Sequence, residues 1–206
     1  MKFNIETQRK FNNVTIDYGI IKGNNNILFI KAGLDGSMYG YENKYLKIAR
    51  EVNKKYGSTV ICSSNPSDGN NNSLEDAMIV IESFCKDNNY RDYEVYYMGY
   101  SNGGLLGAWY GTKYPRIKRL LLINAPLMFN YHKTKESLEH FDKKQVILIY
   151  GSEDQSYPYI GLLDRISNKK VNYYVIEDQD HHFSNAGYDF TKLPFDYLYN
   201  DKQSKN

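Results

Sequence analysis

The sequence has little cysteine and no long run of apolar residues. Only two of its 206 residues are cysteines, Cys62 and Cys85, and both stand in apolar segments rather than at metal-ligand spacing. We therefore expect two buried free thiols and no disulfide framework. No segment approaches the roughly 20 apolar residues of a membrane-spanning helix, and the opening MKFNIETQRKFNN lacks the apolar stretch of a signal peptide. These absences predict a cytoplasmic protein without a membrane span.

An excess of charge of either sign is also missing. Lysine and arginine number 26 and aspartate and glutamate 24, a balance that disfavours nucleic acid or an anionic membrane as partner. Aromatic residues reach 15%, which argues against disorder. Without an internal repeat or a linker-like stretch, residues 1–206 are predicted to form one domain, with a frayed polar tail at 200–206. The oligomeric state is left open.

What the chain does contain is an alternation of short apolar runs and longer amphipathic stretches. Six runs are predicted to be strands, at 26–33, 58–66, 93–101, 119–126, 145–154 and 170–178. Four stretches between them are predicted to be helices, at 45–57, 73–87, 102–115 and 159–168. This order predicts an α/β fold with a mainly parallel central sheet flanked by helices. Residues 13–23 are expected to add a hairpin or an antiparallel edge strand, whereas Pro194 speaks against a regular last helix.

The stretch GYSNGG, residues 99–104, is a candidate nucleophile site. Its first five residues have the spacing G-x-S-x-G and lie where the third predicted strand turns into a helix. A sharp strand-to-helix turn would expose the hydroxyl of Ser101, and it needs small neighbours such as Gly99 and Gly103 because the two backbones approach closely. The alternative is an ordinary turn serine, since so short a pattern also arises by chance.

A serine nucleophile needs a base, and the base needs an orienting acid. His181 and His182 follow the last predicted strand, and Glu153 and Asp154 end the one before it. The carboxyl ends of parallel strands share one edge of the sheet, so either histidine and either acid could reach the serine. The other two histidines, His132 and His140, stand in a polar segment and are expected at the surface.

Four motifs together resemble those of the α/β-hydrolase family, over roughly residues 25–190: KAGLDGS at 31–37, GYSNGG at 99–104, YGSEDQSYP at 150–158 and DQDHHF at 178–183. The chain departs from the family pattern at Ala32, where a histidine is usual. The resemblance implies a triad of Ser101, Asp154 and His181. It also implies an oxyanion hole formed by the backbone N–H groups of Leu34 and Asn102. The insert at 127–144 is short for the family, which implies a minimal cap or none.

The predicted function is that of a serine hydrolase that cleaves a small carboxylic ester or thioester through an acyl-enzyme on the serine. Candidates to line its pocket are Asp35, Met128, Phe129 and Tyr157. Ordinary packing explains the last three equally well, and for Asp35 a cap on the following helix is the favoured alternative. The expected partner is a small acyl substrate, with no metal or organic cofactor. The alternative is a ligand-binding or receptor-type protein on the same fold with little or no turnover. A nucleotide-binding module is disfavoured because no G-x-G-x-x-G or Walker pattern follows the first strand.

Overall fold

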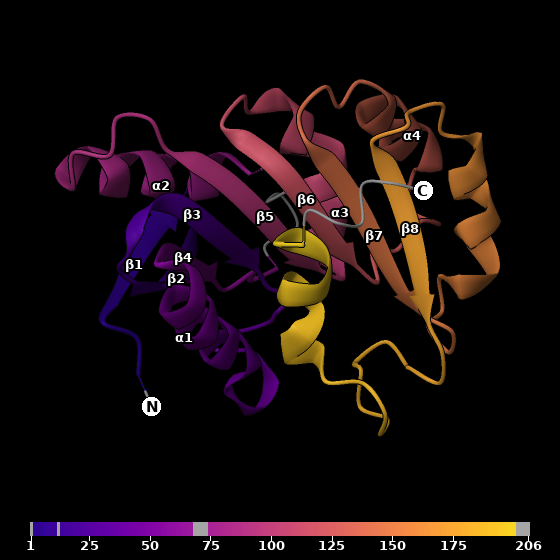
Figure 1. Ribbon diagram of the computed structural model, residues 1–206, viewed down its shortest axis with the longest axis horizontal. Helices are drawn as coiled ribbons and strands as arrows, with labels where there is room; N and C mark the ends of the chain where they lie inside the picture. Colours follow the sequence, from indigo (N-terminus) through magenta and orange to yellow (C-terminus); the bar gives the residue numbers. More distant parts are fainter. Residues whose placement is uncertain (1, 12, 68–73, 201–206) are drawn as a thin grey trace.

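A computed structural model describes residues 2–11, 13–67 and 74–200, and within them the chain forms one eight-stranded sheet (Figure 1). The strands are, in chain order, β1 Ile5–Phe11, β2 Val14–Ile21, β3 Asn24–Lys31, β4 Ser58–Ser63, β5 Glu94–Tyr100, β6 Ile117–Ile123, β7 Gln145–Gly151 and β8 Val171–Ile176. Their spatial order is β1-β2-β4-β3-β5-β6-β7-β8. β1, β2 and β4 pair antiparallel, and the pairings that join β4, β3, β5, β6, β7 and β8 are all parallel.

Helices cover both faces of the sheet. The α-helices are α1 Lys44–Tyr56, α2 Glu75–Asp87, α3 Asn102–Tyr110 and α4 Tyr131–Glu139. Short 3-10 helices span Tyr41–Asn43, Gly111–Lys113, Tyr157–Arg165 and Phe190–Lys192, and a π-helix spans Pro194–Leu198. Figure 1 shows α1 and the yellow C-terminal segment on the same side of the sheet, in front of it in this view.

The alternation of side chains along each strand divides the core into two layers. In β3, Leu28 and Ile30 face α1 and the C-terminal segment, whereas Ile27 and Phe29 face the layer that includes α2, α3 and α4. All four side chains are buried, which is why the strand reads as a continuous apolar run rather than an alternating one. The predicted α/β fold with a mainly parallel sheet is therefore confirmed.

The structure differs from the sequence-based expectations at several elements. β1 was not predicted, because its polar residues point mostly to solvent on both faces. Residues 13–23 form neither a hairpin of their own nor an edge strand: they hold the single antiparallel strand β2, which lies between β1 and β4. The helix expected at 159–168 is a 3-10 helix over Tyr157–Arg165, with Pro158 in its first turn and only Leu163 buried. Within 127–144, α4 forms the crossover from β6 to β7 and packs Leu138 into the core. Of the tail at 200–206, residues 201–206 lie outside the described residues.

A buried ion pair closes the end of β3. The ammonium of Lys31, whose side chain is 0% exposed, lies 3.3 Å from the Asp76 carboxylate on α2. The Tyr18 hydroxyl donates to the same carboxylate oxygen at 2.9 Å, and the carbonyl of Ser64 lies 3.4 Å from the ammonium. Burial lowers the pKa of Lys31, and Asp76 opposes that shift. The loop that follows Lys31 faces Ser101, so this pair anchors the base of the candidate site.

We expect Lys31→Met to destabilise the protein strongly, because it leaves a buried carboxylate without its counter-charge. Breaking such a pair costs roughly 3–5 kcal/mol, or a fall of about 6–20 °C in melting temperature for a chain of this size. The double variant Lys31→Met/Asp76→Asn should be more stable than the single one, because the amide oxygen still accepts from Tyr18. Thermal unfolding followed by circular dichroism measures both, with the exposed Lys54→Met as control. A single variant as stable as that control contradicts the prediction.

Candidate active site

Ser101 occupies the turn between β5 and α3 in a strained conformation. Its φ of 52° and ψ of −120° lie in a region that residues with a side chain rarely adopt. Its backbone N–H donates to the carbonyl of Ile123 on β6 at 2.8 Å, and its carbonyl accepts from Leu105 in α3 at 3.0 Å. Hydrogen bonds to both the sheet and the helix therefore fix the conformation of the turn.

Two glycines allow this turn because backbone fills the space where their side chains would be. A Cβ on Gly99 would lie 2.4 Å from the Gly103 carbonyl oxygen. A Cβ on Gly103 would lie 2.5 Å from the carbonyl oxygens of Lys31 and Ala32 at the end of β3. Neither contact can be relieved by moving a flexible side chain, so the close approach of β3, β5 and α3 requires glycine at both positions.

Ser101, His181 and Asp154 form a continuous chain of hydrogen bonds. His181 Nε2 lies 2.9 Å from Ser101 Oγ, and His181 Nδ1 lies 2.5 Å from Asp154 Oδ2. The Asp154 side chain is 0% exposed and that of His181 is 32% exposed. The other Asp154 oxygen accepts from the backbone N–H of Ser156 at 2.7 Å, which fixes the carboxylate. The arrangement can deprotonate the serine hydroxyl and stabilise the cation that forms on the imidazole.

The rival residues of the sequence analysis point elsewhere. Glu153 is exposed, and its carboxylate accepts from the side chain of Asn185 at 3.0 Å. His182 is exposed too, with Nδ1 3.0 Å from the Tyr100 hydroxyl. His132 and His140 lie on or beside α4 and are both exposed, in line with the expectation of surface positions.

Asn124, directly after β6, joins the loops that carry the acid and the base. Its side-chain N–H groups donate to the carbonyls of His181 at 2.9 Å and Asp180 at 3.3 Å, and its side-chain oxygen accepts from the Gly151 N–H at 3.0 Å. Asn124 is completely buried and has a φ of 45°. The Tyr100 hydroxyl, from the nucleophile turn, donates to the same His181 carbonyl at 2.8 Å. Sequence reasoning did not single out either residue; the one available signal was a polar residue directly after an apolar strand.

The loop after β3 lies against the serine, as an oxyanion hole requires. A Cβ on Gly33 would come within 3.2 Å of the Ser101 Cβ. Among the described residues, neither the Leu34 nor the Asn102 backbone N–H has a hydrogen-bond partner, so both remain available for a ligand oxygen. The Asn65 side chain fixes their spacing: it donates to the Ala32 carbonyl at 3.1 Å and to the Asn102 side-chain oxygen at 2.9 Å.

Comparison with known proteins gives structural matches alone. No protein-family model matches the sequence, and a search of curated proteins finds no significant match. Among solved structures, the chain is similar to Est1E from Butyrivibrio proteoclasticus, with a TM-score of 0.64 and 12% identity over 87% of this chain and 91% of that one.

Two further solved structures agree with this match. One is an alpha-beta serine hydrolase homologue from Coxiella burnetii, with a TM-score of 0.67 and 13% identity over 89% of this chain and 91% of that one. The other is the esterase domain of a Rhodothermus marinus protein, with a TM-score of 0.64 and 11% identity over 88% and 90%. The chain has the α/β-hydrolase fold. At such low identity the likeness establishes the fold, and function has to be argued from the site.

Within this α/β-hydrolase fold the predicted pocket residues take different positions. The Asp35 carboxylate accepts from the backbone N–H of Ser67 at 2.9 Å, so it ties two loops together and caps no helix. Met128, Phe129 and Tyr157 are large apolar side chains that remain exposed after the ends of β6 and β7, Phe129 to 61%. The thioether of Met128 lies 4.0 Å from the hydroxyl of Ser156 in the loop that carries the acid.

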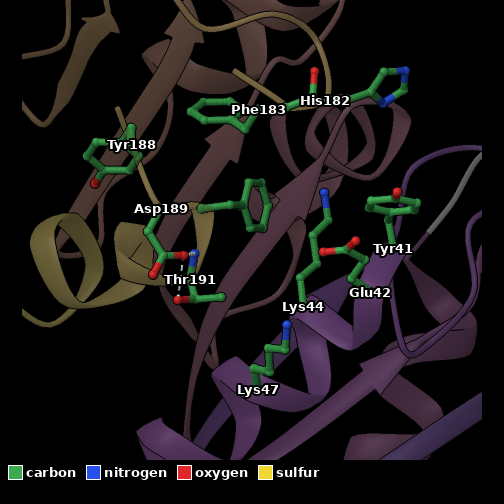
Figure 2. A pocket seen from close by; sticks show the side chains of 11 residues that line it. Tyr41, Glu42, Lys44, Lys47, His182, Phe183, Tyr188, Asp189 and Thr191 are labelled. Atoms are coloured by element: carbon green, nitrogen blue, oxygen red, sulfur yellow. Dashed lines mark hydrogen bonds between the residues drawn. The ribbon is translucent and has the colours of Figure 1, made fainter. Parts of the chain in front are cut away.

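A cavity of about 780 Å³ opens beside the loop that carries the histidines (Figure 2). Its walls come from the 3-10 helix Tyr41–Asn43, the start of α1 and residues 182–191. None of the residues predicted to line a pocket belongs to it. Among the described residues no group of three histidine, cysteine, aspartate or glutamate side chains could hold a metal ion. In the same part of the chain no helix is long and apolar enough to cross a membrane.

Proposed function

We propose that the protein is a serine hydrolase that cleaves small carboxylic esters or thioesters through an acyl-enzyme on Ser101. The observation that carries the proposal is the hydrogen-bonded chain from Ser101 through His181 to Asp154. Similarity to solved structures described as esterases and as a serine hydrolase homologue supports it. Chance seldom places a strained serine, an imidazole and a buried carboxylate in this order at three strand ends.

In the first half of the reaction, His181 acts as general base. A carboxylate at Nδ1 favours the tautomer that carries its proton on that nitrogen, which leaves Nε2 free to accept the proton of the Ser101 hydroxyl. The serine oxygen attacks the acyl carbonyl and forms a tetrahedral intermediate. His181 then passes its proton to the leaving alcohol or thiol, and the acyl group stays on the serine.

The developing oxyanion would accept hydrogen bonds from the N–H groups of Leu34 and Asn102. Removing one such donor typically costs on the order of 10²–10³ in rate, so the Asn65 contacts that hold the two segments together matter for catalysis. Water completes the cycle: His181 deprotonates it, it attacks the acyl-enzyme, and Ser101 is regenerated with the carboxylic acid as product.

The bond cleaved is proposed to be an ester or thioester of modest size. One solved structure similar to this chain is described as Est1E with ferulic acid bound, at a TM-score of 0.61 and 13% identity. This description of a structure with the same fold supports a small organic acid or ester as ligand. The exposed side chains of Met128, Phe129 and Tyr157 would give the acyl portion an apolar surface.

Steady-state hydrolysis tests the function. Purified protein is assayed with p-nitrophenyl acetate, butyrate and octanoate, and with the thioester S-phenyl thioacetate. We expect turnover of at least one ester well above the rate with Ser101→Ala. Activity should fall for the longest chain, because the exposed side chains of Met128 and Phe129 offer an open surface to it. If a fluorophosphonate labels the serine while no ester turns over, the ligand-binding alternative replaces the hydrolase.

A further inference from the structure

The cavity beside the histidine loop has aromatic walls and a cationic floor. Tyr41, Phe183, Tyr188 and Phe190 line it. Figure 2 shows Tyr41 on the side opposite to Phe183 and Tyr188. Lys44 rises from the first turn of α1 and points toward the loop of His182 and Phe183 (Figure 2). A volume of about 780 Å³ is in the usual range for a site that encloses a small molecule.

The ammonium of Lys44 lies over aromatic rings, and no described side chain forms an ion pair with it. Its Nζ is 4.0 Å from the ring centroid of Phe190 and 4.4 Å from that of Tyr100. Among the described residues it makes no hydrogen bond and no ion pair. Burial lowers the pKa of Lys44 to about 8, and the nearby charge of Asp180 offsets only part of this shift. A cation kept partly out of water without a partner is a group that a bound anion would stabilise.

The neighbouring carboxylates do not supply that partner. Asp189 uses one oxygen to accept from the backbone N–H of Thr191 at 2.9 Å and from its hydroxyl at 2.7 Å. Asp180 accepts from the backbone N–H groups of His182 and Ser184, each at 2.9 Å. Glu42 is exposed at the rim. Among the described residues none of these acids forms an ion pair with Lys44, although Asp180 acts on it at longer range.

The same rings connect this ammonium to the candidate active site. Tyr100 precedes Ser101 in the chain, and its ring centroid lies 5.4 Å from that of His181. One face of the cavity is formed by His182 and Phe183, directly after His181. In the proposed mechanism His181 protonates the leaving group. His181 itself does not line the cavity, so a leaving group reaches the cavity only by extending past His182 and Phe183.

We propose that the cavity is a leaving-group subsite for a flat aromatic alcohol that bears a carboxylate, with Lys44 as the residue that binds the carboxylate. This inference rests on the proposed hydrolase function and narrows its substrate class to esters of carboxylated phenols or similar aromatic alcohols. The rings of Tyr41, Tyr188 and Phe190 enclose the flat portion, and a charge-assisted hydrogen bond from the ammonium selects the anion.

A matched pair of substrates tests the subsite: 4-acetoxybenzoate and its uncharged methyl ester, which share the acetyl group and the phenolic leaving oxygen. The value of kcat/KM for each is divided by its rate constant for hydroxide-catalysed hydrolysis, which removes the difference in leaving-group reactivity. We expect the wild type to prefer the carboxylate by roughly tenfold or more, the scale of one hydrogen bond to a charged group. Lys44→Met should bring the ratio close to one, and Lys44→Arg should restore the preference.

Lys55→Met is the matched control. Lys55 stands on the same helix and also lies over two rings, 5.2 Å from that of Tyr56 and 5.1 Å from that of Phe195, but it lines no part of the cavity. This variant should keep both the activity and the preference of the wild type. If the methyl ester is hydrolysed as well as the carboxylate, the subsite is wrong while the hydrolase function stands.

Binding to an inactive protein separates the subsite from the chemistry. Calorimetric titration of Ser101→Ala with 4-hydroxybenzoate, the alcohol product, should give an affinity that falls by roughly tenfold on adding Lys44→Met and stays the same on adding Lys55→Met. Lysine-dependent binding without hydrolysis of either ester would support the site and overturn the function. Absence of binding in Ser101→Ala, or binding that ignores Lys44, overturns the subsite.

Discussion

Wild-type protein treated with a fluorophosphonate is expected to gain the mass of a single adduct, and Ser101→Ala is expected to gain none. The reagent phosphonylates only serines whose hydroxyl an adjacent base has activated, and Ser101 Oγ lies 2.9 Å from His181 Nε2. Intact-mass spectrometry reads the outcome directly. In steady-state assays the same substitution should lower kcat by about 10⁶, the scale seen when the nucleophile of a serine triad is removed.

A serine elsewhere provides the control for this experiment. Ser83 lies on α2, where its hydroxyl is 3.5 Å from the Arg9 guanidinium and no imidazole is hydrogen-bonded to it. The Ser83→Ala variant should therefore gain the same single adduct as the wild type and hydrolyse esters with the same kcat. An adduct that persists in Ser101→Ala, or no adduct on the wild type after long exposure, would show that Ser101 is not an activated nucleophile.

Asp154→Asn should lower kcat by about 10⁴ while substrate binding changes little. An amide at this position no longer holds the proton on His181 Nδ1 and no longer stabilises the imidazolium, which is the cause of a loss of that size in serine triads. Glu153→Gln, one residue away, removes a charge of the same sign but should stay within about threefold of the wild type. Measuring kcat and KM for both variants with one p-nitrophenyl ester gives the comparison.

The pair is well matched because Glu153 and Asp154 share one loop and differ in where they point. Asp154 is buried against His181, and Glu153 is exposed beside Asn185. Equal losses in the two variants would mean that the loop as a whole, and not the Asp154 carboxylate, supports activity. Circular dichroism of each variant shows that the sheet is intact.

Much of the fold could be predicted because buried parallel strands leave a plain signature. The central parts of β3, β6 and β7, residues 27–30, 120–123 and 146–150, are apolar without interruption, since both of their faces are covered. β1 has no such signature because its five central residues are charged or polar and the strand is mostly exposed. The rule that functional groups collect at the carboxyl ends of strands indicated Ser101 but left two acids and two histidines open. The resemblance to α/β-hydrolases selected Asp154 and His181, which the structure joins to Ser101 by hydrogen bonds. Their catalytic roles stay predictions.

The rest of the site could not be predicted from the sequence because it depends on contacts between segments that are far apart in the chain. Nothing in the local sequence of Lys44 distinguishes it from the other lysines of α1; its surroundings come from Tyr100 and Phe190. The expected pocket residues were chosen for their closeness to strand ends, whereas the cavity is built by the start of α1 and the segment after the histidines. The length of a side chain and the direction in which it points decide such contacts, and a pattern of residue types fixes neither.

The position of Asn124 has a consequence for how the protein matures during synthesis. Its side chain holds the His181 carbonyl, 57 residues further along, and the Gly151 N–H, 27 residues further along. The nucleophile and its base are themselves separated by 80 positions. Ser101 can therefore contact its base only after the ribosome has released the chain beyond β8. Until then the Asn124 side chain lacks the hydrogen-bond partners that it has in the folded protein. The Ser101 hydroxyl becomes reactive only when β8 has joined the sheet. Fluorophosphonate labelling of nascent chains would therefore report when the fold is complete.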